Sequence, residues 1–191
     1  MRGKFIVLYG INNLGKTTQA ELLAARIGGK TVLVKYPVYN LEPSGPMIND
    51  YLRKGNPLGL SPETFQTLQV LNRLQFQPKL EAMLESGTNV ITECYRGTGI
   101  AWGVGAGVNK EYLIRLNEFL FAEDIALLLD GKRFLGGVEK GQAHETKDEM
   151  MERVRAAFLD LAKEFRWRVI NANRTVEEVH ENIWNEVRKI I

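Results

Sequence analysis

Residues 4–19, "KFIVLYGINNLGKTTQ", decide which fold the sequence predicts. Residues 5–9 are apolar throughout and predict a buried β-strand, which ends at Gly10. Residues 10–17 then follow the order glycine, four residues of any type, glycine, lysine and threonine, which is the phosphate-loop pattern. The pattern stands between a predicted strand and a predicted helix, as a phosphate loop requires. The stretch therefore predicts a nucleotide-binding loop rather than a glycine turn with a solvated lysine.

Each residue type in this loop has a physical task on a phosphate. The two glycines let the backbone turn its N–H groups toward phosphate oxygens, and the following helix adds the positive end of its dipole. Lys16 supplies a full positive charge to the outer phosphates, and the hydroxyl of Thr17 can reach a magnesium ion. The predicted nucleotide-binding residues are Gly10, Asn13, Leu14, Gly15, Lys16, Thr17 and Thr18.

The composition fits a globular protein and argues against several other classes. Apolar residues make up 45% of the 191 residues and charged residues 25%, which is ordinary for a single domain with a sizeable core. The net charge is +2 with acids and bases interspersed, which disfavours a nucleic-acid-binding surface. No apolar run approaches the ~20 residues of a membrane span. The single cysteine, Cys94, excludes an internal disulfide. We expect a cytoplasmic protein that acts on small molecules.

Strand-like runs alternate with helix-like segments along the chain. This alternation predicts one α/β domain, residues 1–191, with a parallel sheet covered by helices on both faces. The predicted strands are residues 5–9, 31–36, 89–92, 125–129 and 167–170. The predicted helices are residues 17–27, 47–54, 61–86, 111–121, 147–166 and 175–191. Residues 97–107 are glycine-rich and receive no assignment.

Two acidic residues follow predicted strands, where ligands bind in parallel sheets. Glu93 ends the third strand, and a carboxylate there can hold magnesium through water or take a proton from an attacking hydroxyl. Asp130 ends the fourth strand in the same way. A helix cap or a salt bridge is the alternative for either acid. We expect function at Glu93 and a structural role at Asp130.

Segment 131–145 is polar and glycine-containing, and it carries Lys132, Arg133, Lys140 and His144. Cations on a small lid would neutralise the migrating phosphoryl group, although a solvated loop has the same composition. We expect a lid here and take Arg133 as its candidate catalytic residue.

Three further side chains leave two interpretations open. Arg73 has apolar neighbours on the predicted helix 61–86, so its guanidinium either reaches solvent or points into a ligand cleft. Tyr95 and Trp102 either wall a base pocket or belong to the core, where aromatic residues are more often found.

The chain resembles the thymidylate kinase family of P-loop nucleoside monophosphate kinases nearly from end to end. The segments that carry the resemblance are "GKTTQ" (15–19), "KYP" (35–37), "GPMINDYL" (45–52), "LNR" (71–73), "ECYRGTGIAW" (93–102), "EDIALLLD" (123–130), "ERVRAAFLDLA" (152–162) and "INANRTVEEVHENIW" (170–184). The last two are specific to the family but lie mostly in scaffold.

The resemblance implies a three-layer P-loop NTPase fold with a five-stranded parallel sheet, a homodimer, and magnesium-dependent transfer of the ATP γ-phosphoryl group to dTMP. Carried over by position, Thr17 and Glu93 serve magnesium, and Asn173 and Arg174 lie near adenine. The implied catalytic residues are Lys16, Glu93 and Arg133. The implied acceptor-binding residues are Asn12, Pro37, Gln69, Arg73, Tyr95, Arg96, Gly99 and Trp102.

The chain departs from the family mainly on the acceptor side. Cys94 replaces an arginine that grips phosphate, and Arg96 is the candidate substitute two residues further on. A second arginine is replaced near Tyr39, and Gln69 replaces the aromatic residue that stacks on thymine. Each charge-assisted phosphate contact is worth roughly 1.5–3 kcal/mol, so these changes alter the acceptor site while the donor site stays intact.

The leading hypothesis is a kinase of dTMP or a close relative. A deoxynucleoside kinase is the first alternative, because its acceptor carries no phosphate and needs no arginine to grip one. A nucleotide-binding regulator without turnover is the second alternative, and the intact Lys16, Thr17 and Glu93 argue against it.

Overall fold

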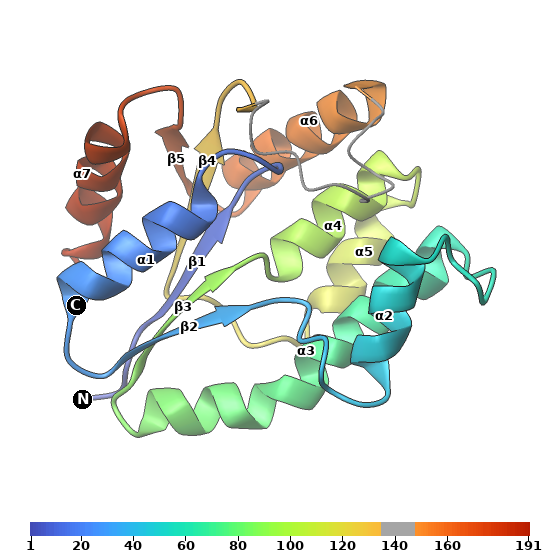
Figure 1. The fold of residues 1–191 in the computed structure, drawn as a ribbon, viewed down its shortest axis with the longest axis horizontal. Helices are drawn as coiled ribbons and strands as arrows, with labels where there is room; N and C mark the ends of the chain where they lie inside the picture. The colour runs from blue at the N-terminus through green and yellow to red at the C-terminus, as the bar shows by residue number, and fades with distance from the viewer. Residues whose placement is uncertain (135–147) are drawn as a thin grey trace.

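A computed structural model describes residues 1–134 and 148–191 of the chain, without the side chain of Asp148. Its centre is a parallel five-stranded sheet in the order β2-β3-β1-β4-β5 (Figure 1). The strands are β1 Phe5–Tyr9, β2 Thr31–Lys35, β3 Asn89–Glu93, β4 Ile125–Asp130 and β5 Arg168–Asn171. The predicted α/β class and all the predicted strands are confirmed.

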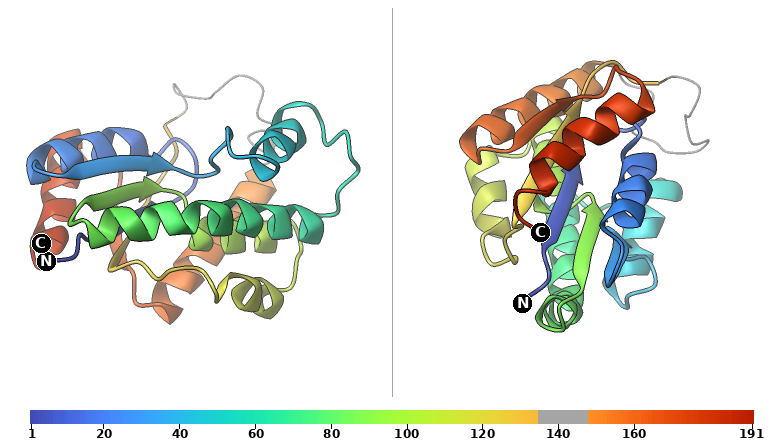
Figure 2. Two further views of the ribbon diagram at one scale, coloured as in Figure 1. Left: turned by 90° about the horizontal axis from the view of Figure 1, so that it is seen from below. Right: turned by 90° about the vertical axis from the view of Figure 1, so that its left-hand side faces the viewer.

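Helices cover both faces of the sheet (Figure 2). They are α1 Lys16–Ile27, α2 Ser44–Arg53, α3 Pro62–Glu85, α4 Arg96–Gly105, α5 Lys110–Asn117, α6 Asp148–Glu164 and α7 Val176–Val187. Helices α1 and α7 pack together on one face, and α3, α4 and α6 lie on the other, with α5 against α4. None of the helices within the described residues is long and apolar enough to cross a bilayer.

The central strand β1 forms the middle of the core, because neighbouring strands flank it on both sides and helices cover both its faces. All of its residues, 5–9, are buried. Parallel pairing sets Leu8 beside Glu93 in β3 and Leu127 in β4, so the carboxyl ends of the strands reach the same edge of the sheet. The first turn of α1 starts from this edge, and the site is built there.

The structure corrects the sequence interpretation at residues 97–107. This glycine-rich stretch forms most of α4, despite the low helix propensity of glycine. The reason is close packing: a Cβ on Gly97 would overlap the Trp167 ring, and one on Gly105 would overlap Val154 of α6. Tertiary contact therefore stabilises a helix that local propensity disfavours. Helix α2 also begins three residues earlier than residues 47–54 suggest, at Ser44.

The close contact between α4 and α6 is testable at Gly105. We expect Gly105→Ala to lower the free energy of unfolding by about 1–3 kcal/mol, because the added methyl group has no space beside the buried Val154. Urea denaturation measures this change. The control is the double variant Gly105→Ala/Val154→Ala, in which the alanine at 105 should cost much less than it does in the wild-type background. Additive losses would contradict the contact.

Candidate active site

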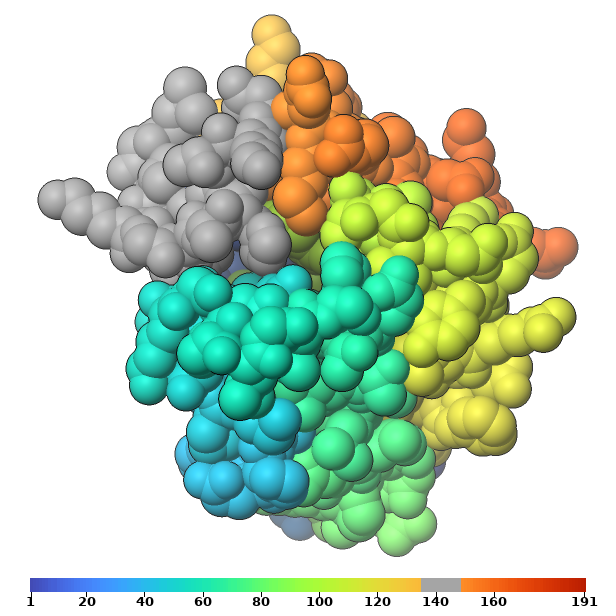
Figure 3. All heavy atoms as spheres, turned by 90° about the vertical axis from the view of Figure 1, so that its right-hand side faces the viewer, coloured from blue at the N-terminus to red at the C-terminus, as the bar shows by residue number. Residues whose placement is uncertain are grey.

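A cleft with a volume of about 540 Å³ lies at the carboxyl edge of the sheet. The phosphate loop forms one end of it, and side chains of α2, α3 and α4 form the other. Figure 3 views the molecule from the side on which α2, the start of α3, α4 and the start of α6 meet. The position agrees with the rule that ligands of parallel α/β sheets bind beyond the strand ends.

The phosphate loop has the backbone that its glycines predict. Gly10 has φ 135° and Gly15 has φ 76°, both in the region that glycine favours. A Cβ on Gly10 would lie 2.5 Å from the carbonyl oxygen of Leu129, so a side chain cannot be placed there. Asn13 has φ 61°, a conformation that asparagine tolerates better than most residues. Helix α1 follows these turns and begins at Lys16.

Lys16 is only 7% exposed, and its Nζ donates a hydrogen bond of 2.7 Å to the carbonyl oxygen of Ile11. Burial lowers the pKa of this ammonium group, while Cys94 and Glu93 act in the opposite direction. The side chain lies across the loop of which it is part. A buried cation held in this way is preorganised for a phosphate and contributes little to packing.

Thr17 and Glu93 come together as predicted. The Thr17 hydroxyl donates a hydrogen bond of 3.0 Å to Glu93 Oε2, which joins the start of α1 to the end of β3. A hydroxyl and a carboxylate are oxygen ligands of the kind that magnesium prefers, and magnesium usually takes few protein ligands and several waters or phosphate oxygens. No cluster of three or more acidic, histidine or cysteine ligands occurs among the described residues. The pair therefore fits a magnesium ion that is carried mainly by a nucleotide.

Arg73, on α3, also lines the cleft. It is 3% exposed, and neither Nε nor Nη1 has a hydrogen-bond partner within the described residues. Burial lowers the pKa of the guanidinium, and the nearby hydroxyls of Tyr95, Tyr9 and Tyr36 act against that effect. Of the two sequence interpretations, the structure supports a guanidinium in the ligand cleft and not one that reaches solvent.

Most of the other predicted acceptor residues also line the cleft: Asn12, Pro37, Gln69, Gly99 and Trp102. Position 99 favours glycine, because a Cβ there would lie 3.2 Å from both Arg73 Nη1 and Gln66 Oε1. The absence of a side chain at residue 99 leaves room for these two polar groups beside α4.

Two predicted acceptor residues lie elsewhere, and these expectations are corrected. Arg96 forms an ion pair of 2.8 Å with Glu123 and does not line the cleft, because it begins α4 on the side that faces the loop before β4. It therefore does not stand in for a phosphate-binding arginine. Tyr95 is fully buried beneath the cleft against Phe5 and Tyr36, so it belongs to the core.

Several lining residues escaped the sequence analysis: Lys35, Tyr51, Arg53, Phe65 and Gln66. Lys35 ends β2, one strand away from Glu93, and the rule that ligands follow strand ends would have found it. The others lie on α2 and the start of α3, and nothing in their sequence spacing indicates that these helices close over the cleft.

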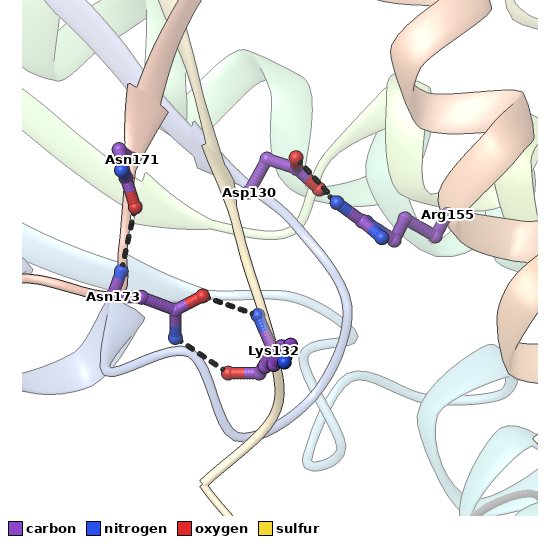
Figure 4. Close-up of polar contacts among 5 residues, drawn as sticks. All are labelled: Asp130, Lys132, Arg155, Asn171 and Asn173. Atoms are coloured by element: carbon purple, nitrogen blue, oxygen red, sulfur yellow. Dashed lines mark hydrogen bonds and ion pairs between the residues drawn. The ribbon is translucent and has the colours of Figure 1, made fainter.

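Asn173, one of the two residues expected near adenine, joins the segments that follow β4 and β5 (Figure 4). The side chain of Asn173 accepts a hydrogen bond of 2.6 Å from the Lys132 amide and donates one of 2.9 Å to the Lys132 carbonyl oxygen. Neither Asn173 nor Arg174 is among the residues that line the cleft. Asp130 accepts hydrogen bonds from Arg155 Nε and Nη2 at 2.6 and 2.8 Å, which is the structural role expected for it.

The predicted lid lies largely outside the described residues, which omit 135–147 and so include neither Lys140 nor His144. Its first residues are described. Phe134 lines the cleft, and its amide donates a hydrogen bond of 2.9 Å to the carbonyl oxygen of Asn13 in the phosphate loop. Arg133 thus stands one residue from a direct contact with the loop, and its catalytic role stays a prediction.

With the fold and the cleft established, comparison with known proteins identifies the family. Residues 8–183 match the family model described as thymidylate kinase. The chain belongs to the thymidylate kinase family. The match spans the phosphate loop, the cleft, α6 and the first part of α7.

Individual thymidylate kinases are similar to the chain over nearly its whole length. It is 29% identical over 194 residues to the thymidylate kinase of Plasmodium falciparum, covering 99% of this chain and 91% of that protein. It is 34% identical over 196 residues to a probable thymidylate kinase of Pyrococcus abyssi, with 96% and 95% covered. The solved thymidylate kinase of Candida albicans has a TM-score of 0.83 at 24% identity, with 98% and 92% covered. That structure supports the P-loop fold.

The ion pair at Asp130 predicts a pH-dependent stability. Hydrogen bonding from Arg155 lowers the pKa of this carboxyl group, so the pair stabilises the fold above the ordinary carboxyl pKa of 3.8. The contribution disappears as the pH falls through the lowered pKa. We expect Asp130→Asn to cost about 0.5–1 kcal/mol at neutral pH and nothing at acidic pH, measured by urea denaturation. The control, Arg155→Met, should behave alike, and the double variant should lose no more than either.

The burial of Arg73 predicts that replacing it will raise the stability of the ligand-free protein and weaken acceptor binding. We expect Arg73→Met to raise the free energy of unfolding of the ligand-free protein by about 1–3 kcal/mol, because a buried cation whose Nε and Nη1 lack hydrogen-bond partners is replaced by an apolar side chain. Nucleotide acceptors should then protect the variant less against thermal unfolding. Thermal melts with and without acceptor measure both effects. A variant that is less stable than the wild type without ligand would contradict this account.

Proposed function

We propose that this protein transfers the γ-phosphoryl group of ATP to dTMP, or to a closely related nucleoside monophosphate, to give the diphosphate. The observation that carries the proposal is that Lys16, Thr17 and Glu93 line a single cleft together with the buried Arg73. A donor site and an acceptor pocket on a single cleft fit transfer between two bound nucleotides. The names of the relatives support dTMP as the acceptor.

The residues of the cleft have separate tasks in such a transfer. Lys16 neutralises the outer phosphates of the donor, and the loop amides bind their oxygens. Thr17 and Glu93 would hold a magnesium ion, which supplies charge neutralisation on the donor phosphates when bound. Arg73 binds the acceptor, and Trp102 and Pro37 contribute apolar surface beside it. Phosphoryl transfer needs mainly positioning and positive charge, and this set provides both.

A deoxynucleoside kinase stays the alternative, because the replaced arginines at Cys94 and Tyr39 weaken the argument for an acceptor phosphate. The number of cations along the cleft favours a monophosphate. Lys35 and Arg53 add to Lys16 and Arg73, and a phosphate-free acceptor would need fewer. Competition between dTMP and thymidine separates the two functions, since the proposal expects dTMP to be phosphorylated with the higher kcat/KM.

The proposal is tested by ADP release with ATP, magnesium and a panel of nucleosides and monophosphates. We expect dTMP to be among the best acceptors. The variant Lys16→Met should lose at least about a hundredfold in kcat, because the buried cation on the transferred group is removed. Lys30→Met, an exposed residue just before β2, is the matched control and should keep full activity. Turnover of no acceptor by the wild type would leave only a nucleotide-binding regulator.

The homodimer and the cytoplasmic location stay predictions drawn from the family and from the composition. Light scattering of the purified protein tests the first, and the location of a tagged protein in intact cells tests the second.

A further inference from the structure

Lys35 is a cation that lines the cleft and is not part of the phosphate loop. It is the last residue of β2, and parallel pairing sets it directly beside Glu93 of β3. Its Nζ lies 3.8 Å from Glu93 Oε2, the same oxygen that accepts the hydrogen bond from Thr17. The ammonium group therefore lies beside the Thr17–Glu93 pair, at which the donor phosphates and their magnesium ion would bind under the proposed function.

The other cations that line the cleft have other positions. Lys16 is hydrogen-bonded within its own loop, on the donor side. Arg73 is buried near the hydroxyls of Tyr95, Tyr9 and Tyr36. The guanidinium of Arg53 lies over the ring of Tyr39, 5.4 Å from its centre. Of the lining cations within the described residues, Lys35 is the one ion-paired with the carboxylate of the transfer centre.

The ion pair does not hold Lys35 in place. The Lys35 side chain is 65% exposed, the Glu93 side chain is 11% exposed, and 3.8 Å is a long contact. A long contact with a solvent-exposed ammonium group contributes little to stability, so the ammonium group can turn to a phosphate at little cost. A compact, flexible ammonium group suits a point contact with a phosphate oxygen.

We propose that Lys35 binds the phosphate of the acceptor nucleotide and holds it in line with the transferred group. This inference rests on the proposed function and extends it, because it assigns acceptor-phosphate recognition to the end of β2. It also explains how the chain tolerates the uncharged Cys94, which follows Glu93 and lines the same cleft. Positive charge is supplied from the neighbouring strand instead.

The first experiment compares Lys35→Met with wild type, with Lys35→Arg as the conservative variant and Lys30→Met as the control at the opposite end of β2. We expect Lys35→Met to raise KM for dTMP at least about tenfold, the effect of losing one charge-assisted hydrogen bond, with KM for ATP little changed. Lys35→Arg should keep most of the affinity. Calorimetry should show weaker dTMP binding but unchanged thymidine binding, because thymidine has no phosphate.

A second experiment places a positive charge at residue 94 in place of the one removed at residue 35. In the Lys35→Met background, Cys94→Arg should restore much of the dTMP affinity, since residue 94 is the next position beside the same carboxylate. The backbone φ of 63° at Cys94 is equally unfavourable for both side chains. The proposal is overturned if Lys35→Met raises KM for ATP rather than dTMP, weakens thymidine binding equally, or leaves all constants unchanged. It is also overturned if Arg53→Met raises KM for dTMP specifically and Lys35→Met does not.

These outcomes are distinguishable from a failure of the proposed function. If the wild type phosphorylated thymidine but not dTMP, the proposed function would fall, and calorimetry with dTMP and thymidine would still report whether Lys35 contacts a phosphate. If dTMP were phosphorylated with unchanged constants in Lys35→Met, the function would stand and the role of Lys35 would fall.

Discussion

The hydrogen bond from the Thr17 hydroxyl to Glu93 is the contact on which the arrangement of the site depends. It connects two parts of the chain that are 76 residues apart, and it can form only because β1 and β3 are parallel neighbours with their carboxyl ends aligned. Parallel pairing thus brings a loop, a carboxylate and Lys35 to one edge without any dedicated connection between them. The buried central strand holds this edge rigid, and the cleft opens beyond it.

The buried positive charges in the cleft reduce the stability of the fold. Lys16 and Arg73 are both buried, and burial lowers the pKa of each. A buried cation without a matched anion costs free energy of folding, and proteins retain such groups mainly where a ligand needs them. Both residues line the same cleft. Each cation can therefore bind an anionic or carbonyl-bearing group of a ligand, which would compensate its burial.

The position of α4 shows how the core reaches the cleft. Tyr9, at the end of β1, stacks on Trp167 with ring centres 4.3 Å apart, and Gly97 of α4 fits against both rings. Close approach through glycine sets where α4 lies over the sheet, and hence where Gly99 and Trp102 line the acceptor pocket. A packing constraint on the far side of α4 thus helps to place the residues that would bind an acceptor.

The sequence by itself determined the sheet, the phosphate loop and the role of Glu93 as an edge residue, because each depends on local pattern. Apolar runs of strand length and the spacing of Gly10 and Gly15 are encoded within a few residues. Only the tertiary structure decided which cations face the cleft. Arg96 turned to Glu123, Lys35 came to lie beside Glu93, and residues 96–105 became a helix. These outcomes depend on contacts between segments far apart in the sequence, whose geometry no local propensity specifies.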